Sequence, residues 1–411
     1  MPPNDRQRVR GDTSLMNTPR TVLISIAAVL VAAAALAQAP QLVTPPPPPT
    51  GPAAALAVPP PPAVPTSAYV LIDYSTGRVL AGQRAHDSME PASITKLMTG
   101  YLVFAAIRDK RLRLDEDIII SEHAWRSEGS RTFVKVGSRV PADVLIKGMI
   151  VQSGNDATIA LAERVAGTEP AFVDMMNQQA ARLGMKDTHF ENSWGGPAPT
   201  HRSSAFDLAI MGQALIRDFP QDYKIYSLRE FIWNGIRQQN RNGLLGKDPT
   251  VDGIKTGHTD SARYCLVSSA KRGGMRLIAV VLGSDSVKDR EDASAALLNY
   301  GFTFYETLKL QEGNRLVLKP HVWKSAEEFV PVGTARDIYA TVARGQGVGI
   351  EKNVTVNAKL TAPIAAGTTV GELTIKSGTE VVARAPLITL AQATESGFFA
   401  GLVDSIKLWL Q

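Results

Sequence analysis

Two kinds of hydrophobic pattern divide the first three quarters of the chain. Short apolar runs bounded by polar or turn residues are typical of strands, and they occur at residues 69–73, 78–80, 264–267 and 277–282. Between them, residues 97–104 are apolar nearly all round, which indicates a helix buried on every side. Strands at both ends of a helical region predict an α+β domain, which we place at residues 67–310.

A different pattern begins after residue 310, where apolar residues recur at every second position. One face of such a strand is expected in a core and the other in water, and the apolar positions are Val354, Val356, Ala358 and Leu360. Residues 373–375 and 381–383 flank a Ser-Gly pair and predict a hairpin. We therefore expect a small all-β domain over residues 311–392.

The last segment, residues 393–411, is amphipathic. At helical spacing it carries an apolar face made of Phe398, Phe399, Leu402, Val403, Ile406, Trp409 and Leu410. The segment is too short and too charged to cross a bilayer, whereas its aromatic residues suit a helix that lies in the headgroup plane. We expect a membrane-attachment helix, and a helix packed on the β domain is the alternative.

The N-terminal part carries targeting and spacer signals. An apolar run from Val22 to Leu36 follows Arg20 and ends at an Ala-Leu-Ala pattern, which predicts a secretory signal peptide over residues 1–37. A membrane anchor is the alternative, but the run is shorter than the ~20 residues that a spanning helix needs. Residues 38–66 contain two proline tracts and predict an extended linker, with a ligand for a proline-binding domain as the weaker alternative.

Composition narrows the partners and the chemistry. The chain is 44% hydrophobic and 20% charged, which excludes disorder throughout. With 44 Lys and Arg against 39 Asp and Glu, the net charge of +5 gives little reason to expect nucleic acid as a partner. The single cysteine, Cys265, cannot close an intrachain disulfide, and the 6 histidines lack metal-ligand spacing, so neither redox nor metal chemistry is predicted.

A candidate nucleophile opens the buried helix. Pro91 suits the first turn of a helix, and Ser93 and Lys96 are three residues apart, so their side chains share one face within reach of each other. A serine hydroxyl needs a base, and a lysine serves as one only when burial or a second cation suppresses its charge. The positive potential of a helix N-terminus would favour the developing alkoxide. We therefore predict Ser93 as the nucleophile and Lys96 as the general base.

Two other short matches carry less weight. Ser268 and Lys271 repeat the Ser-x-x-Lys spacing, but they follow a strand-like run and would project to opposite faces of a strand. Lys376-Ser377-Gly378 repeats a Lys-Ser/Thr-Gly pattern, and the predicted hairpin already explains it. We assign no chemistry to either match.

Two further motifs add to the candidate site. Ser153-Gly154-Asn155 follows an apolar run, and Lys255-Thr256-Gly257-His258 follows Val251-Asp252-Gly253-Ile254. A loop turn is the alternative interpretation of Ser-Gly-Asn, because all three residue types favour turns. The order Ser-x-x-Lys, Ser-x-Asn and Lys-Thr-Gly is nevertheless much rarer than any one of the motifs, and it is typical of penicillin-recognising serine acyl enzymes.

Each of these residues has a plausible physical role. Ser153 can relay a proton to the leaving amine, and Asn155 can orient the Lys96 amine and hold a substrate amide. Lys255 supplies a cation that lowers the pKa of Lys96 and attracts a carboxylate. Gly257 permits close approach of a peptide-like substrate to a strand edge.

Residues 67–411 together resemble a low-molecular-weight penicillin-binding protein, a serine-type D-alanyl-D-alanine carboxypeptidase of peptidase family S11. The segments that carry the resemblance are Ala92–Thr99, Gln152–Ala157 and Val251–Thr259, followed by the β domain and the terminal helix. The resemblance implies a penicillin-binding transpeptidase/β-lactamase-like catalytic domain of antiparallel sheet and helices, then a small β-sandwich. It also implies that the C-terminal amphipathic helix attaches the protein to the outer face of the inner membrane, in the periplasm.

The same resemblance implies the reaction. Ser93 would attack the carbonyl between two D-alanines of a peptidoglycan stem pentapeptide, and water would release the tetrapeptide from the acyl-enzyme. Backbone N–H groups of Ser93 and His258 would form the oxyanion hole. No cofactor is implied, and β-lactam antibiotics would act as covalent inhibitors. The substrate-binding residues would be Lys255, Thr256, Gly257 and His258, with Arg241 and Arg290 near the terminal carboxylate.

Three other functions stay open. A class A β-lactamase shares the three motifs, but that family has a single domain, and we find no obvious Glu-x-x-Leu-Asn motif here. A D,D-endopeptidase that cuts cross-links is closer, although its usual relatives lack the second domain. A non-catalytic wall-binding factor would have no need of intact Ser93, Lys96 and Lys255.

Overall fold

The structure is a computed structural model that describes residues 58–347, 349–357 and 359–396. The predicted signal peptide, most of the predicted linker and residues 397–411 of the predicted terminal helix lie outside the described residues. Among the residues that are described, no helix is both long enough and apolar enough to cross a membrane.

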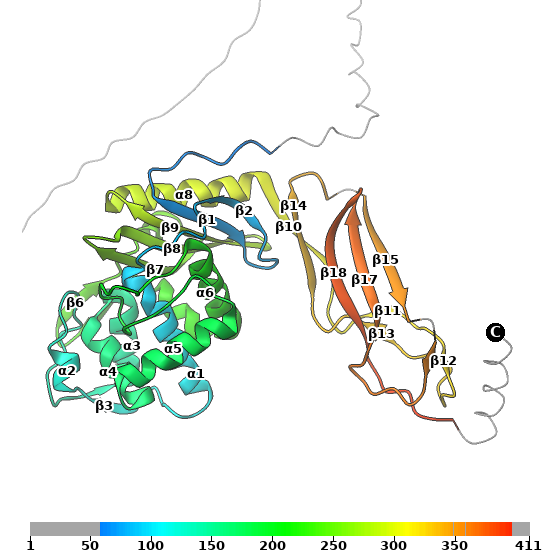
Figure 1. Ribbon diagram of the computed structural model, residues 1–411, viewed down its shortest axis with the longest axis horizontal. Helices are drawn as coiled ribbons and strands as arrows, with labels where there is room; N and C mark the ends of the chain where they lie inside the picture. The colour runs from blue at the N-terminus through cyan, green and yellow to red at the C-terminus, as the bar shows by residue number, and fades with distance from the viewer. Residues whose placement is uncertain (1–57, 348, 358, 397–411) are drawn as a thin grey trace, which may run out of the picture. The chain divides into compact units, whose positions relative to one another are not determined.

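The α+β domain is built on a five-stranded antiparallel sheet with the order β2-β1-β9-β8-β7 (Figure 1). Its strands are β1 (Ala68–Asp73), β2 (Val79–Gln83), β7 (Val251–Thr259), β8 (Arg263–Arg272) and β9 (Met275–Ser284). The strands predicted at the two ends of the helical region are confirmed. They pair directly, because β1 lies beside β9 with Val70 opposite Val280.

Successive residues of β1 pack into two different cores. Val70 and Ile72 belong to a cluster with the helical region, while Tyr69 and Leu71 belong to a cluster with α8 (Val287–Phe304). Neighbouring side chains of a strand point to opposite faces, so both faces of this sheet are covered and the strand is apolar throughout. The domain therefore has three layers, with α8 on one face of the sheet and the helical region on the other (Figure 1).

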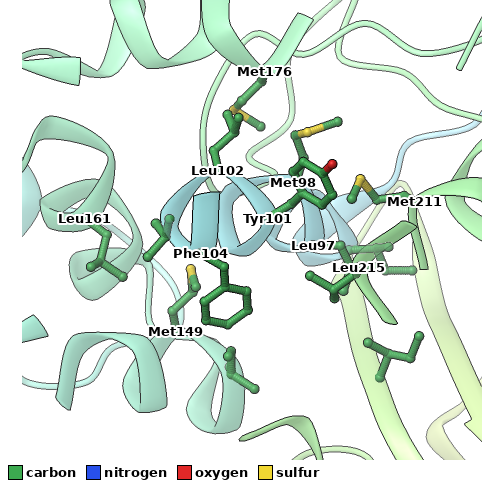
Figure 2. Packing of buried hydrophobic residues seen from close by; sticks show 14 of the residues in the cluster. Leu97, Met98, Tyr101, Leu102, Phe104, Met149, Leu161, Met176, Met211 and Leu215 are labelled. Carbon is green, nitrogen blue, oxygen red and sulfur yellow. The ribbon is translucent and has the colours of Figure 1, made fainter. Parts of the chain in front are cut away.

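Helix α1 (Lys96–Arg108) is the centre of the helical layer, and its residues 96–104 are all buried, as the apolar run predicted. Figure 2 shows Leu97, Met98, Tyr101, Leu102 and Phe104 among Met149, Leu161, Met176, Met211 and Leu215 of neighbouring elements. A 3-10 turn, η1 (Ala92–Thr95), precedes α1, so Ser93 lies on the tighter turn and Lys96 begins the α-helix. The expectation that both residues share one α-helix is wrong in this detail. Their side chains still meet, because positions three apart eclipse each other in a 3-10 turn.

The other elements of this layer surround α1. The helices are α2 (Glu122–Trp125), α3 (Ala142–Lys147), α4 (Asn155–Ala166), α5 (Glu169–Leu183), α6 (Ala205–Asp218), α7 (Leu244–Lys247), the π-helical turn η2 (Gly148–Gln152) and the 3-10 helix η3 (Asp222–Ser227). Two small hairpins pair β3 (Asp117–Ile119) with β4 (Arg139–Pro141), and β5 (Glu230–Trp233) with β6 (Ile236–Gln239). Thr168, Ser204 and Ser286 each accept a hydrogen bond from the backbone N–H three residues on, which fixes where α5, α6 and α8 begin.

Part of the predicted linker packs on the α+β domain. Val58 and Val64 contact the cluster beneath α8, and the hydroxyl of Tyr300 donates to the carbonyl of Pro59 at 2.9 Å. A proline tract forms no core of its own, but its carbonyls and flanking valines can bind a surface that is already formed. Residues 58–66, the end of the predicted linker, thus contact the α+β domain.

Beyond α8, the described residues form a β-rich region with a five-stranded sheet, β11-β13-β18-β17-β15, and the pairs β10-β14 and β12-β16 (Figure 1). The strands are β10 (Tyr305–Gln311), β11 (Leu316–Leu318), β12 (Val322–Trp323), β13 (Val332–Gly333), β14 (Ile338–Ala343), β15 (Ile350–Val356), β16 (Leu360–Thr361), β17 (Thr369–Ser377) and β18 (Glu380–Thr389). Strand β10 pairs with β14 and starts directly after α8. The region thus begins before the boundary expected at residue 311.

The expected hairpin is confirmed in β17 and β18, where Ile375 lies opposite Ala383. Gly378 lies in the turn between the two strands and has a left-handed φ of +59°. The alternation expected over residues 354–360 holds only in part. Val354 is 39% exposed, because β15 lies at the edge of the described sheet, whereas Leu360 is buried in β16. Ala358 lies outside the described residues.

The boundary expected for the terminal helix also differs. Residues 393–396 belong to the β-rich region, since Ala393 bridges to Ile364 and Glu395 bridges to Ser325. The backbone hydrogen bonds of these residues are thereby satisfied without a helix.

Candidate active site

Motifs from distant parts of the chain converge on one pocket with a volume of about 620 Å³. Its lining comprises Ser93, Gly129, Ser130, Ser153, Asn155, Trp194, Gly195, Arg241, Thr256, Gly257, His258, Thr259, Tyr264, Val287 and Arg290. Lys96 and Lys255 are buried against this lining, with 1% and 3% of their surface exposed. The structure therefore places every candidate site residue of the sequence motifs at this pocket.

Lys96 has three hydrogen-bond partners. Its Nζ lies 2.9 Å from Ser93 Oγ, 2.7 Å from Asn155 Oδ1 and 2.7 Å from the carbonyl oxygen of Trp194. Burial lowers the pKa of Lys96 well below its usual value, and the positive charges of Lys255 and Arg241 lower it further. The neutral amine is therefore favoured at this position.

The partners fix the direction of that amine. A neutral amine has two N–H bonds and one lone pair, and a carbonyl oxygen can only accept a hydrogen bond. The amide of Asn155 is held with its oxygen toward Lys96, because its Nδ2–H donates to the carbonyl of Glu128 at 2.5 Å. With both N–H bonds directed at Asn155 and Trp194, the lone pair of Lys96 faces the hydroxyl of Ser93. This arrangement can remove the proton of Ser93.

Ser153 ends the turn η2 with a left-handed φ of 67°. The turn interpretation of Ser-Gly-Asn is thus correct for the backbone, and it places the side chain in the pocket lining. The Oγ of Ser153 is buried and has no hydrogen-bond partner among the described residues. Because buried hydroxyls are normally paired, this one has spare capacity to exchange a proton with a bound ligand.

Lys255 lies on β7, the strand at the pocket-side edge of the sheet. Its Nζ donates to the carbonyl of Thr256 at 3.1 Å. Burial lowers its pKa to about 7, and the positive charges of Arg241 and Arg290 act in the same direction. A buried amine beside two guanidinium groups would be stabilised in its charged form by an anionic ligand such as a carboxylate.

Gly257 packs directly against the turn that carries Ser93. A Cβ added there would lie 2.9 Å from the carbonyl oxygen of Pro91 and 3.2 Å from the Cβ of Ala92. A glycine is therefore required for the close approach between β7 and the turn η1 that carries Ser93. The missing side chain lets the strand and the nucleophile turn pack together.

The two candidate arginines meet at the pocket wall. Arg290, on the first turn of α8, is 4% exposed, and its Nη2 donates to the carbonyl of Arg241 at 3.2 Å. The Nε of Arg290 is buried and unpaired within the described part of the chain. Arg241 is exposed at the rim, and the structure thus brings both guanidinium groups to one side of the pocket.

Sequence reasoning missed three residues at this site. The ring centre of Tyr264 lies 4.2 Å from that of His258, and the Arg290 guanidinium lies 5.7 Å from the ring centre of Tyr264. Tyr264 pairs with His258 across β7 and β8, and the strand predicted at residues 264–267 did not reveal that partner. Asp156, adjacent to Asn155, accepts hydrogen bonds from the 132–134 backbone. Trp194 contributes a carbonyl, which no motif can reveal.

The two rejected matches have no part in the site. Ser268 is buried in β8, where its hydroxyl donates to the carbonyl of Ala279 at 3.3 Å, and Lys271 is exposed. Lys376-Ser377-Gly378 lies in the hairpin of β17 and β18. Neither match lines the pocket.

A serine that faces the lone pair of a buried lysine, beside a second lysine on a sheet edge, defines a penicillin-recognising serine acyl enzyme. The family model of the D-alanyl-D-alanine carboxypeptidases, peptidase S11, matches residues 55–286, and that of the penicillin-binding protein 5 C-terminal domain matches residues 305–395. The chain belongs to this family of serine-type carboxypeptidases.

Individual relatives agree with this assignment. D-alanyl-D-alanine carboxypeptidase DacA of Escherichia coli (strain K12) is 41% identical over 84% of this chain and 88% of its own length. Penicillin-binding protein 5 from Haemophilus influenzae has a TM-score of 0.77 at 37% identity, covering 82% of this chain and 99% of that one. Penicillin-binding protein D2 from Listeria monocytogenes, solved in its ampicillin-bound form, has a TM-score of 0.55 at 30% identity, covering 59% of this chain and 100% of that one.

Proposed function

We propose that this protein removes the terminal D-alanine from peptidoglycan stem pentapeptides through an acyl-enzyme on Ser93. The observation that carries the proposal is the Lys96 amine, 2.9 Å from Ser93 Oγ and held by two carbonyl oxygens that direct its lone pair to the hydroxyl. Lys96 takes the proton as Ser93 Oγ bonds to the carbonyl carbon between the two D-alanines.

Collapse of the tetrahedral intermediate then breaks the amide bond. The leaving amine needs a proton, and Lys96 returns one through the unpaired hydroxyl of Ser153. The backbone N–H groups of Ser93 and His258 serve as the oxyanion hole, each such donor being worth about 3–4 kcal/mol of transition-state binding. A water molecule adds to the acyl carbon, and the tetrapeptide leaves as Ser93 regains its proton.

Recognition of the substrate rests on its terminal carboxylate. Lys255 and Arg290 are buried cations, and Arg241 lies at the rim of the same pocket. Thr256, Gly257 and His258 offer the β7 edge to the peptide backbone, in the manner of an added strand. Penicillins mimic this peptide end and acylate Ser93, consistent with the ampicillin-bound relative.

A labelled penicillin tests the acyl-enzyme. We expect covalent label on the unmodified chain and none on Ser93→Ala. Ser268→Ala is the matched control, because Ser268 has the same Ser-x-x-Lys spacing but lies away from the pocket. It should be labelled normally. Absence of label on the unmodified chain would reject an enzymatic function and favour a wall-binding factor.

The substrate class is tested by comparing two peptides. Release of D-alanine from a pentapeptide, with little cleavage of cross-linked dimers, is the expected result. Cleavage of dimers without trimming of the pentapeptide would instead identify an endopeptidase.

Location is a second part of the proposal, carried by the sequence of the two ends. Residues 1–37 would direct secretion to the periplasm, and the amphipathic terminal segment would hold the protein on the outer face of the inner membrane.

A deletion tests the membrane attachment. Because residues 393–396 pair within the β-rich region, the informative deletion removes residues 397–411. It should release the protein from the membrane fraction while pentapeptide trimming persists. Unchanged membrane association would overturn this part.

A further inference from the structure

The segment around Trp194 is held against the nucleophile turn from several sides. Thr99 Oγ1, one turn after Lys96, donates to the carbonyl of Ser193 at 2.5 Å. The side-chain oxygen of Asn192 accepts from the backbone N–H of Gly195 at 2.7 Å. A Cβ added at Gly195 would collide with the carbonyl of Ala92. The position of the Trp194 carbonyl is therefore set by contacts on both sides of it.

One carboxylate also anchors this segment. Glu169, the first residue of α5, is 9% exposed, and its Oε1 accepts from both the backbone N–H of Ser193 at 2.9 Å and the Ser193 hydroxyl at 2.6 Å. Its other oxygen, Oε2, lies 2.8 Å from Nε2 of His123. A carboxylate this buried is normally held by such bonds, and here two of them converge on the residue directly before Trp194.

We propose that Glu169 is a positioning residue for the acyl-transfer reaction, acting through Ser193 and the Trp194 carbonyl on the lone pair of Lys96. This inference rests on the proposed function. The carbonyls of Asn155 and Trp194 receive the two N–H bonds of neutral Lys96, so displacement of either one frees an N–H bond and lets the lone pair turn away from Ser93. Asn155 is part of a motif, whereas the Trp194 carbonyl depends on the residues that fix its backbone.

Glu169 does not line the pocket, so substrate affinity should not depend on it. Its loss should act on the chemical step, since a misplacement of about 1 Å at a reacting group costs up to roughly a hundredfold in rate. A role confined to helix stability would instead lower the melting temperature and leave the acylation rate of the folded protein unchanged. The two roles therefore differ in a measurable way.

The test compares acylation by labelled penicillin in three variants of the full chain. Glu169→Ala should acylate roughly ten- to a hundredfold more slowly. Glu169→Gln should stay within about threefold of the unmodified chain, because its amide oxygen can accept both bonds from Ser193. Asp174→Ala, which removes an exposed carboxylate from the same helix, is the control and should leave the rate unchanged.

Binding is measured separately in a Ser93→Ala background. There, Glu169→Ala should leave the dissociation constant of the stem pentapeptide within about twofold, since only the chemical step is affected. If Glu169→Ala does not fold, Ser193→Ala removes one of the two bonds and should slow acylation severalfold. An acylation rate equal to that of the unmodified chain in a folded Glu169→Ala or Ser193→Ala variant overturns this inference alone. Absence of label on the unmodified chain would instead overturn the proposed function.

Discussion

The buried carboxylate of Asp156 accepts a hydrogen bond from the backbone N–H of Thr132 at 2.7 Å. It also accepts from the N–H groups of Phe133 and Val134, at 2.9 and 3.3 Å. Asp156 directly follows Asn155, the residue that orients Lys96, at the start of α4. Its hydrogen bonds therefore connect Asn155 to residues 132–134, and the nearby Gly129 and Ser130 line the pocket. Because the carboxylate accepts hydrogen bonds from these three backbone N–H groups in a buried position, its loss would leave buried donors unpaired and destabilise the fold.

Replacing Asp156 by asparagine tests the importance of these hydrogen bonds to residues 132–134. An amide offers one acceptor oxygen and turns its NH2 toward backbone donors, so we expect the free energy of unfolding to fall by about 2–4 kcal/mol. The negative charge of Asp156 raises the pKa of Lys96, and its removal should lower that pKa further. The acid limb of the penicillin acylation rate should then move to lower pH. Urea unfolding and a pH profile measure the two effects.

Asp174→Asn is the matched control, because that carboxylate is exposed. It should change neither unfolding nor the pH profile. A stability of Asp156→Asn equal to that of the unmodified chain would mean that the 132–134 backbone does not depend on this side chain.

The two lysines should give a bell-shaped pH dependence of kcat/KM for the pentapeptide. Lys96 must be neutral to take a proton, so activity is lost as pH falls and Lys96 gains its charge. The pKa of Lys255 is lowered to about 7, so its attraction for the carboxylate is lost as pH rises above that value. Activity should be highest in the pH range where Lys96 is neutral and Lys255 is still charged.

Lys255→Arg separates the limbs. A guanidinium keeps its charge throughout this range, so the alkaline limb should disappear while the acid limb stays. The measurement is kcat/KM from pH 5 to 10 with both proteins. An alkaline limb that persists in Lys255→Arg would assign it to another group.

Gly257→Ala should disturb the nucleophile turn rather than the substrate. The added methyl would lie 2.9 Å from the carbonyl oxygen of Pro91, closer than real Cβ contacts come, so β7 and η1 must move apart. We expect acylation by penicillin to slow about tenfold or more, as for other small displacements of reacting groups. Gly246→Ala is the control, because a Cβ there meets nothing within 4 Å. Equal acylation rates in the two variants would show that the turn tolerates the shift.

The sequence predicted those parts of the site that depend on side-chain type and spacing. The residues Ser93 and Lys96 were found because three-residue spacing brings side chains together in either kind of helical turn. The Lys-Thr-Gly motif was found because it combines a cation with a glycine on a strand. The α+β class of the first domain was predicted from apolar strands at both ends of a buried helix, whereas its three layers are seen only in the structure.

The parts that were missed depend on backbone groups and on tertiary contacts. Every residue has a backbone carbonyl, so the residue type at position 194 does not indicate that the carbonyl oxygen of Trp194 accepts a hydrogen bond from Lys96. Val354 fits an alternating pattern, yet it is exposed, because the pattern does not reveal which strand lies at a sheet edge. Pro59 and Tyr300 are 241 positions apart in the sequence, and local sequence patterns do not predict contacts between such distant residues.

A buried hydroxyl in the helical core gives the last prediction. Tyr226 is fully buried, and its hydroxyl has no hydrogen-bond partner in the part of the chain that is described. An unpaired buried hydroxyl costs free energy, so Tyr226→Phe should raise the free energy of unfolding by about 1 kcal/mol.

The same hydroxyl restricts Gly100 of α1, where an added Cβ would lie 2.6 Å from it. Gly100→Ala should therefore destabilise the unmodified chain. In the Tyr226→Phe background it should stabilise by up to about 1 kcal/mol, because alanine favours a helix over glycine by that amount. Thermal and urea unfolding of the four proteins measure the coupling, and an equal effect of Gly100→Ala in both backgrounds would show that the hydroxyl is not what requires a glycine there.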